Sequence, residues 1–219
     1  MLLRKYILVC VLLGIVLLVG LTSRRQPSSR PAKQAPSLTI DKQPVTFAMH
    51  TFDPSAPPAG MPALAAWEQA ECDSNFVSDA NVKARTEILD PTHAVVTVAE
   101  LRVTLQLTIN IWVPEGAAEH IIEHEQGHRQ IAEHYYQNAD KVAEQIATAY
   151  LGKQISISGT DLNFEINKSL QQMGAEITTE YSKELNLDLA QNRYDDITDH
   201  SRNDVSAAEA VAQVLREVQ

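Results

Sequence analysis

The sequence predicts an α+β fold, with a small antiparallel sheet from the first half of the chain and long helices from the second. Between residues 101 and 113, apolar side chains alternate with polar ones, as in a strand with one face on a core. In the second half, proline and glycine are rare and apolar residues recur every three or four positions, as in helices. Strands followed by helices indicate segregated layers.

The strands of the first half are expected in three places. Residues 44–52 ("PVTFAMHTF") alternate, residues 93–101 ("HAVVTVAEL") are β-branched, and the clearest strand follows directly and ends at Pro114. A loop rich in proline comes after the first strand, and residues 63–71 predict a short helix.

The second half predicts two long helices. Residues 117–151 form the first helix, which ends at Gly152. A short extended link leads to Leu162, where the second helix begins. Because the link is short, we expect an antiparallel pair packed on the sheet. The apolar face of the second helix continues through Ile166, Leu170, Met173, Ile177, Tyr181 and Leu185.

Residues 1–22 predict a membrane anchor or a signal sequence. After Arg4 and Lys5, an uncharged apolar run extends from residue 6 to residue 21, and spanning helices need about 20 such residues. No small-residue cleavage site follows, which favours an uncleaved anchor. We therefore expect an inner-membrane protein that contacts the membrane through one N-terminal span, with its domain in the periplasm or outside the cell.

The rest of the chain divides into a linker, a domain and a tail. Residues 23–37 are rich in proline, serine and basic residues, as in a flexible linker. Residues 38–203 are long enough to bury a core. Residues 204–219 predict a C-terminal amphipathic tail, to which we assign no function.

Charge and cysteine content exclude several classes of function. The net charge of −10 argues against a nucleic-acid partner, because phosphates attract basic surfaces. Of the two cysteines, Cys10 lies in the apolar run, so the domain holds only Cys72. This excludes a disulfide within the domain and a cysteine-rich zinc site.

A metal-site motif stands near the start of the first predicted helix. His124, Glu125 and His128 match H-E-x-x-H. Helix positions i and i+4 are about 40° apart around the axis, so both imidazoles can reach one cation. Glu125 can take a proton from water and return it to a leaving amine. We expect Zn²⁺, which accepts these ligands tetrahedrally. The opposing interpretation is a polar helix face with stray histidines.

Two segments, "HEQGHRQIAEHYY" and "QNRYDDITDH", carry a family resemblance. Together they resemble the bacterial family of predicted secreted zinc-dependent proteases, known as domain of unknown function 922, over roughly residues 40–201. The family's second motif, Y-D-x-x-T-x-H-G, has Ser201 here in place of glycine. The resemblance implies a zincin-like fold, with residues 38–203 as a metallopeptidase domain, an extracytoplasmic location and peptide-bond hydrolysis.

The third zinc ligand has two candidate sources. Antiparallel pairing of straight helices places Glu184 opposite His128 and makes Glu184 or Glu180 the ligand. The resemblance instead favours His200 as the metal ligand, with Asp195 as its hydrogen-bonded partner. His200 requires the second helix to break, because a straight helix would carry it roughly 20 Å past the metal.

The resulting hypothesis is a membrane-anchored, extracytoplasmic zinc metallopeptidase that hydrolyses protein or peptide substrates. Glu125 would be the catalytic base, and Tyr194 would donate a hydrogen bond to the oxyanion. One alternative is a non-catalytic envelope binding module with a structural metal, whose fourth zinc position would be closed. Another is a zinc hydrolase of a different amide bond, such as one in the cell wall.

Overall fold

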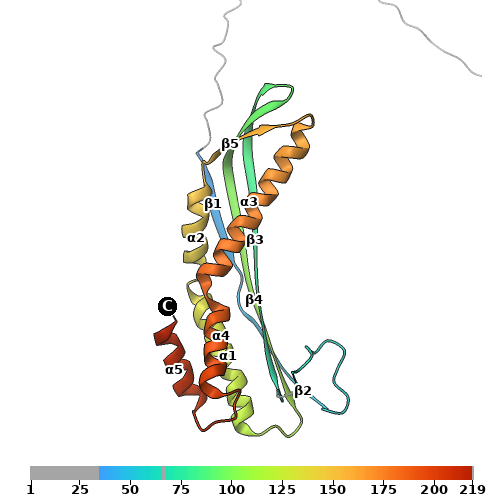
Figure 1. Ribbon diagram of the computed structural model, residues 1–219, viewed down its shortest axis with the longest axis vertical. Helices are drawn as coiled ribbons and strands as arrows, with labels where there is room; N and C mark the ends of the chain where they lie inside the picture. The colour runs from blue at the N-terminus through green and yellow to red at the C-terminus, as the bar shows by residue number, and fades with distance from the viewer. Residues whose placement is uncertain (1–34, 66–67, 219) are drawn as a thin grey trace, which may run out of the picture. The chain divides into compact units, whose positions relative to one another are not determined.

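The computed structural model describes residues 35–65 and 68–218 (Figure 1). These residues belong to one compact unit. The predicted anchor, residues 1–22, and most of the predicted linker lie outside the described residues, so the structure does not test them.

The predicted inner-membrane location with one N-terminal span finds no support among the described residues. Within residues 35–65 and 68–218, no helix is both long enough and apolar enough to cross a membrane. The apolar run on which the prediction rested lies outside these residues.

Two very long antiparallel strands, β3 (Glu71–Asp90) and β4 (His93–Pro114), form the body of the sheet (Figure 1). The two strands predicted at residues 93–101 and 101–113 are one strand, β4. Its alternation is confirmed: Leu101 and Leu105 are fully buried, whereas Arg102 is exposed. One face of the sheet therefore carries the core and the other meets solvent.

Three short strands share the other edge of β4. β5 (Gln154–Ser158) pairs with the start of β4, β1 (Ser37–Lys42) with its middle and β2 (Thr46–Phe52) with its end. β5 is antiparallel to β4, whereas β1 and β2 are parallel to it. Because β3 occupies one edge of β4 along almost its whole length, the three short strands must follow one another along the opposite edge.

The expected α+β fold with a small antiparallel sheet is therefore wrong. Every pairing along the path β1-β4-β2 is parallel, which makes the sheet mixed and the fold α/β. The physical reason is that β1 and β2 continue in one direction along the same edge, separated only by residues 43–45. The short helix expected at residues 63–71 is also wrong, since the described residues there hold no helix and residue 71 begins β3.

Each of the two predicted long helices is divided in two. The first becomes α1 (Glu119–Gln137) and α2 (Ala139–Tyr150), which are separated at Asn138. This break was not predicted from the sequence. The second becomes α3 (Leu162–Leu185) and α4 (Leu187–Thr198). It breaks at Asn186, where φ is 53°, a left-handed conformation that asparagine tolerates. The break that His200 required is thus present.

The helices cover the apolar face of the sheet. α1, α2 and α3 pack against it, and α5 (Ala207–Glu217) packs against α1 and α4. The predicted C-terminal tail therefore contributes to the core through α5, where Val214 is fully buried. The largest fully buried side chains include Tyr194, Leu101, Leu105, Ile109, Ile131 and Ile177.

We predict that Gly174→Ala destabilises the protein. Gly174 lies where α3 crosses β3, and a Cβ there would overlap the backbone carbonyl of Ala80. Alanine favours an isolated helix by about 1 kcal/mol, but the rigid clash should outweigh this and lower the free energy of unfolding by about 1–3 kcal/mol. Gly60→Ala is the control, because nothing lies within 4 Å of its Cβ. Denaturant melts in which Gly174→Ala matched or exceeded the wild type would contradict this packing.

Candidate metal centre

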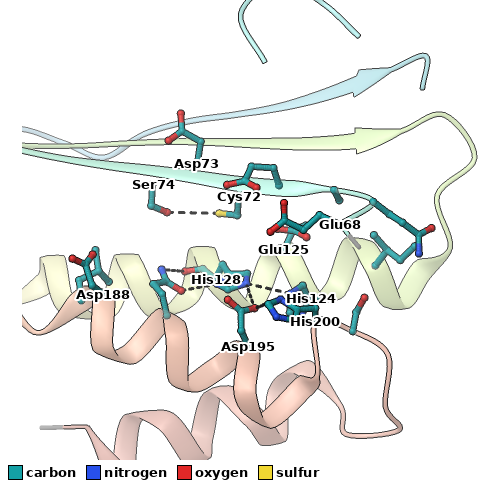
Figure 2. Close-up of a pocket in the computed structure, with 17 residues that line it drawn as sticks. Glu68, Cys72, Asp73, Ser74, His124, Glu125, His128, Asp188, Asp195 and His200 are labelled. Atoms are coloured by element: carbon teal, nitrogen blue, oxygen red, sulfur yellow. Dashed lines mark hydrogen bonds and ion pairs between the residues drawn. The ribbon is translucent and has the colours of Figure 1, made fainter. Parts of the chain in front are cut away.

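Helix α1 presents the three motif residues toward the interior. His124 is 6% exposed and Glu125 is 5% exposed, whereas the side chain of His128 is 13% exposed. The two histidines lie one turn apart on the face toward α4, and the carboxyl group of Glu125 lies between α1 and β3 (Figure 2). The burial of His124 and Glu125 contradicts the interpretation of a solvated polar face with stray histidines.

Asp195 on α4 completes a compact group of donor atoms with the two histidines. Its Oδ1 lies 3.0 Å from His128 Nε2 and 3.4 Å from His124 Nε2, and the two Nε2 atoms are 3.2 Å apart. Metal–ligand distances of about 2.0–2.1 Å in a tetrahedral zinc site place ligand atoms about 3.3 Å apart. The three donors therefore fit one face of a zinc coordination tetrahedron, and they are the one such group found among the described residues.

His200 approaches the same carboxylate from the end of α4. Its Nδ1 lies 3.5 Å from Asp195 Oδ1. Residues 199, 200 and 201 have φ values of 47°, 51° and 65°, so three successive left-handed residues fold the chain back after α4 ends at Thr198. Ser201, which stands where the resemblance expects glycine, adopts a conformation that glycine favours. The end of α4 and this reversal keep His200 at the site.

Gln191 fixes the tautomer of His128. Its side-chain amide donates from Nε2 to the carbonyl oxygen of His128 at 3.1 Å, so its Oε1 must face His128 Nδ1, which lies 2.7 Å away. An amide oxygen can only accept, and Nδ1 must therefore carry the proton. Without a metal, Nε2 can carry a second proton toward Asp195 Oδ1, 3.0 Å away. In the neutral ring that a metal requires, Nε2 is free to bind the ion, as in zinc sites whose ligands are oriented by outer partners.

Tyr194 packs beneath the motif and holds His124. Its fully buried hydroxyl donates to the carbonyl oxygen of His124 at 3.1 Å, and its ring stacks on the His124 ring at 5.0 Å between centroids. A Cβ on Gly127 would overlap this hydroxyl, so the glycine of the motif allows the close approach. Because the hydroxyl is buried and already donates to this carbonyl, it does not face the cavity as the predicted oxyanion contact would require. The structure gives Tyr194 a positioning role.

Two carboxyl groups of the site have opposite pKa shifts. Burial raises the pKa of Glu125 to about 7, and the charge of His128 offsets this only in part. A carboxyl that titrates near neutrality is suited to accept and return a proton. Burial also opposes the ionisation of Asp195, but hydrogen bonds with His124 and His128 outweigh it and hold the pKa of Asp195 below its ordinary value. Asp195 is thus an anionic donor.

The donor group opens into a cavity of about 320 Å³. Its walls are α1, α4, the segment before β3, which contributes Glu68, and the start of β3, which contributes Glu71 (Figure 2). Cys72 also lines the cavity, and burial raises the pKa of its thiol to about 12. A thiol with so high a pKa stays protonated at neutral pH and is a poor metal ligand.

The alternative ligands Glu180 and Glu184 lie away from this group. Both are exposed, neither lines the cavity, and Glu180 accepts a hydrogen bond from Tyr150. His128 contacts Gln191 where the predicted pairing placed Glu184, a difference of seven residues. The prediction assumed two straight helices, whereas β5 and the breaks at Asn138 and Asn186 bring α4 rather than α3 to the motif.

Several parts of the site were not predicted from the sequence. Asp195 was expected only as a hydrogen-bonded partner, and neither Gln191 nor the wall of Glu68 and Glu71 was singled out. One signal was available: Gln191 and Asp195 are four residues apart and so share a helix face. No local sequence pattern could have identified Glu68 and Glu71, because the pairing of β3 with β4 is what brings them close to α1.

Comparisons with models of known families, with curated proteins and with solved structures found no match to this chain. The resemblance to the family of predicted secreted zinc-dependent proteases therefore stays a prediction that rests on the quoted motifs.

We predict that Gln191→Ala weakens zinc binding by about 10–100-fold, because His128 loses the partner that fixes its tautomer and ring orientation. The affinity would be measured by competition with a chromophoric chelator. Gln171→Ala is the matched control, since Gln171 is exposed on α3 and does not line the cavity. Equal affinity in Gln191→Ala and in the wild type would show that the hydrogen bond has no part in metal binding.

Proposed function

We propose that this protein is a zinc-dependent metallopeptidase of the H-E-x-x-H type. One observation carries the proposal: three metal-ligating atoms, on His124, His128 and Asp195, lie 3.0–3.4 Å apart beside the buried carboxyl of Glu125 and line an open cavity. His124, His128 and Asp195 would hold the ion. The mixed donor set of two imidazoles and one carboxylate is one that zinc accepts in catalytic sites.

The reaction divides between the ion and the chain. A zinc ion held by these residues would supply Lewis acidity, lowering the pKa of water and polarising the carbonyl group of a peptide bond. Glu125 accepts the proton of the attacking water and delivers it to the leaving amine. Its burial suits this task, because a pKa near 7 makes both the uptake and the release of the proton feasible at neutral pH.

His200 supports a second candidate function. Its Nδ1 lies 3.5 Å from Asp195 Oδ1, close to the edge length of the same tetrahedron. If His200 were a fourth protein ligand, the site would be closed and the metal structural, as in a non-catalytic binding module. With His200 as a partner of Asp195 instead, the fourth position stays open to water. We favour the open site, because the three donors face a cavity.

The first prediction of this proposal concerns the base. We expect the wild-type chain to bind about one zinc per molecule, and Glu125→Gln to keep the metal while losing hydrolysis by at least about 100-fold, since the amide cannot accept the proton. Metal content and the cleavage of unfolded protein substrates would be measured. The control is Glu123→Gln, because Glu123 is exposed on the same helix. Full activity in Glu125→Gln would remove the catalytic assignment.

The second prediction separates the open site from the closed one. Asp195→Asn replaces an anionic ligand with a neutral amide and should weaken zinc binding about 100-fold or more, whereas His200→Ala should change the affinity by less than about tenfold. Both affinities would be measured by chelator competition. A loss in His200→Ala as large as that in Asp195→Asn, together with an inactive wild type, would favour the closed structural site.

A further inference from the structure

The cavity beside the proposed metal site has an acidic lining. Among the lining residues that the structure describes, none is lysine or arginine, and six carry carboxyl groups: Glu68, Glu71, Asp73, Glu125, Asp188 and Asp195. Of these six, Asp73 points away from the helices (Figure 2), and Glu125 and Asp195 already have roles in the proposed reaction. Three acids remain that have no role in it.

Among the residues that the structure describes, the three remaining acids, Glu68, Glu71 and Asp188, have no lysine or arginine partner, although Glu68 accepts a hydrogen bond from the backbone N–H of Ala65. Within residues 35–65 and 68–218, none of them forms an ion pair with lysine or arginine, whereas acids elsewhere do, such as Asp140 with Lys42. Burial, and then the charge of Glu68, raise the pKa of Glu71. Glu68 and Glu71 therefore repel one another unless a cation lies between them, whereas Asp188 is exposed on the rim of the cavity.

A second observation points to a ligand at this place. Glu125 is 5% exposed, and its carboxyl accepts no hydrogen bond from the described residues. It lies toward the wall that holds Glu68 (Figure 2). A carboxylate held almost wholly out of solvent and without a protein donor is poorly stabilised, so a ligand in the cavity that brings positive charge and donors would stabilise it. A bound zinc ion would offset only two of the carboxylate charges.

The start of β3 suits a peptide rather than a small free cation. β3 pairs with β4 along one edge, and no strand among the described residues pairs with its other edge. Residues 71–74 of β3 line the cavity. An extended peptide can pair with such an edge through its backbone and place alternate side chains beside the acids.

We propose that the cavity selects peptides that carry a lysine or arginine side chain next to the scissile bond, with Glu71 and Glu68 on one wall and Asp188 on the other as the recognising groups. This inference rests on the proposed function.

The test compares peptides that differ at one residue. Three peptides with lysine, alanine or glutamate at the same position would be titrated against the zinc-loaded full-length Glu125→Gln protein by fluorescence anisotropy, and their cleavage by the wild type would be followed separately. We expect the lysine peptide to bind about tenfold or more tightly than the alanine peptide, and the glutamate peptide to bind most weakly. Added salt should shrink the difference.

Matched variants locate the effect. Glu71→Gln in the same background should reduce the preference for lysine at least about threefold, whereas Glu87→Gln should retain it, since Glu87 is exposed further along β3 and does not line the cavity. Asp188→Asn provides an independent test from the opposite wall if Glu71→Gln fails to fold. Equal binding of all three peptides would overturn the inference while leaving the proposed function intact. Preferential binding of the lysine peptide without any cleavage by the wild type would support the inference and count against the proposed function.

Discussion

The close approach of α4 to α1 at Gly127 is the contact on which the site depends. Tyr194 reaches the helix backbone there because no Cβ blocks it, and its hydroxyl satisfies the carbonyl oxygen of His124. The same turn of α4 carries Asp195 between the two histidines, and the turn before it carries Gln191. One glycine thus sets the distance between the helices, and that distance places the third donor. A larger residue at position 127 would push α4 away from α1 and so move Asp195 away from the two histidines.

The sheet supplies the opposite wall of the cavity. β4 is a continuous apolar platform under α1, and β3 follows it antiparallel along its length, so the beginning of β3 returns to the level where β4 ends. This is why Glu71, far from the motif in sequence, acts on the charge of Glu125. Burial against this wall raises the proton affinity of Glu125, and the same wall provides Glu68 and Glu71, which have no lysine or arginine partner among the described residues and would recognise a cationic side chain. The proposed chemistry and the proposed selectivity of the site therefore share one structural origin.

The reversal after α4 shows how the fold accommodates strain near the site. Three successive residues with positive φ are unfavourable for side-chain-bearing residues, at roughly 1–2 kcal/mol each. Local hydrogen bonds hold the turn, including those from Arg202 to the carbonyl oxygen of Asp199 and from Asn203 to that of Ile197. The outcome is that His200 folds back over Asp195 instead of continuing along the helix axis. Strain of this kind is found at functional sites, where the surrounding structure overcomes its cost.

The sequence by itself determined what depends on local periodicity and on short spacing. The alternation in β4 was readable because one face of a strand is buried, and His124, Glu125 and His128 were identifiable because four residues make about one helical turn. The tertiary structure alone decided the rest. The parallel pairing of β1 and β2 with β4 depends on partners more than fifty residues away. The register that brings Asp195, and not Glu184, to the histidines depends on helix breaks and on the packing of Tyr194 against Gly127. Local patterns cannot specify such choices, because side-chain packing between distant segments selects among registers that the periodicity leaves equally possible.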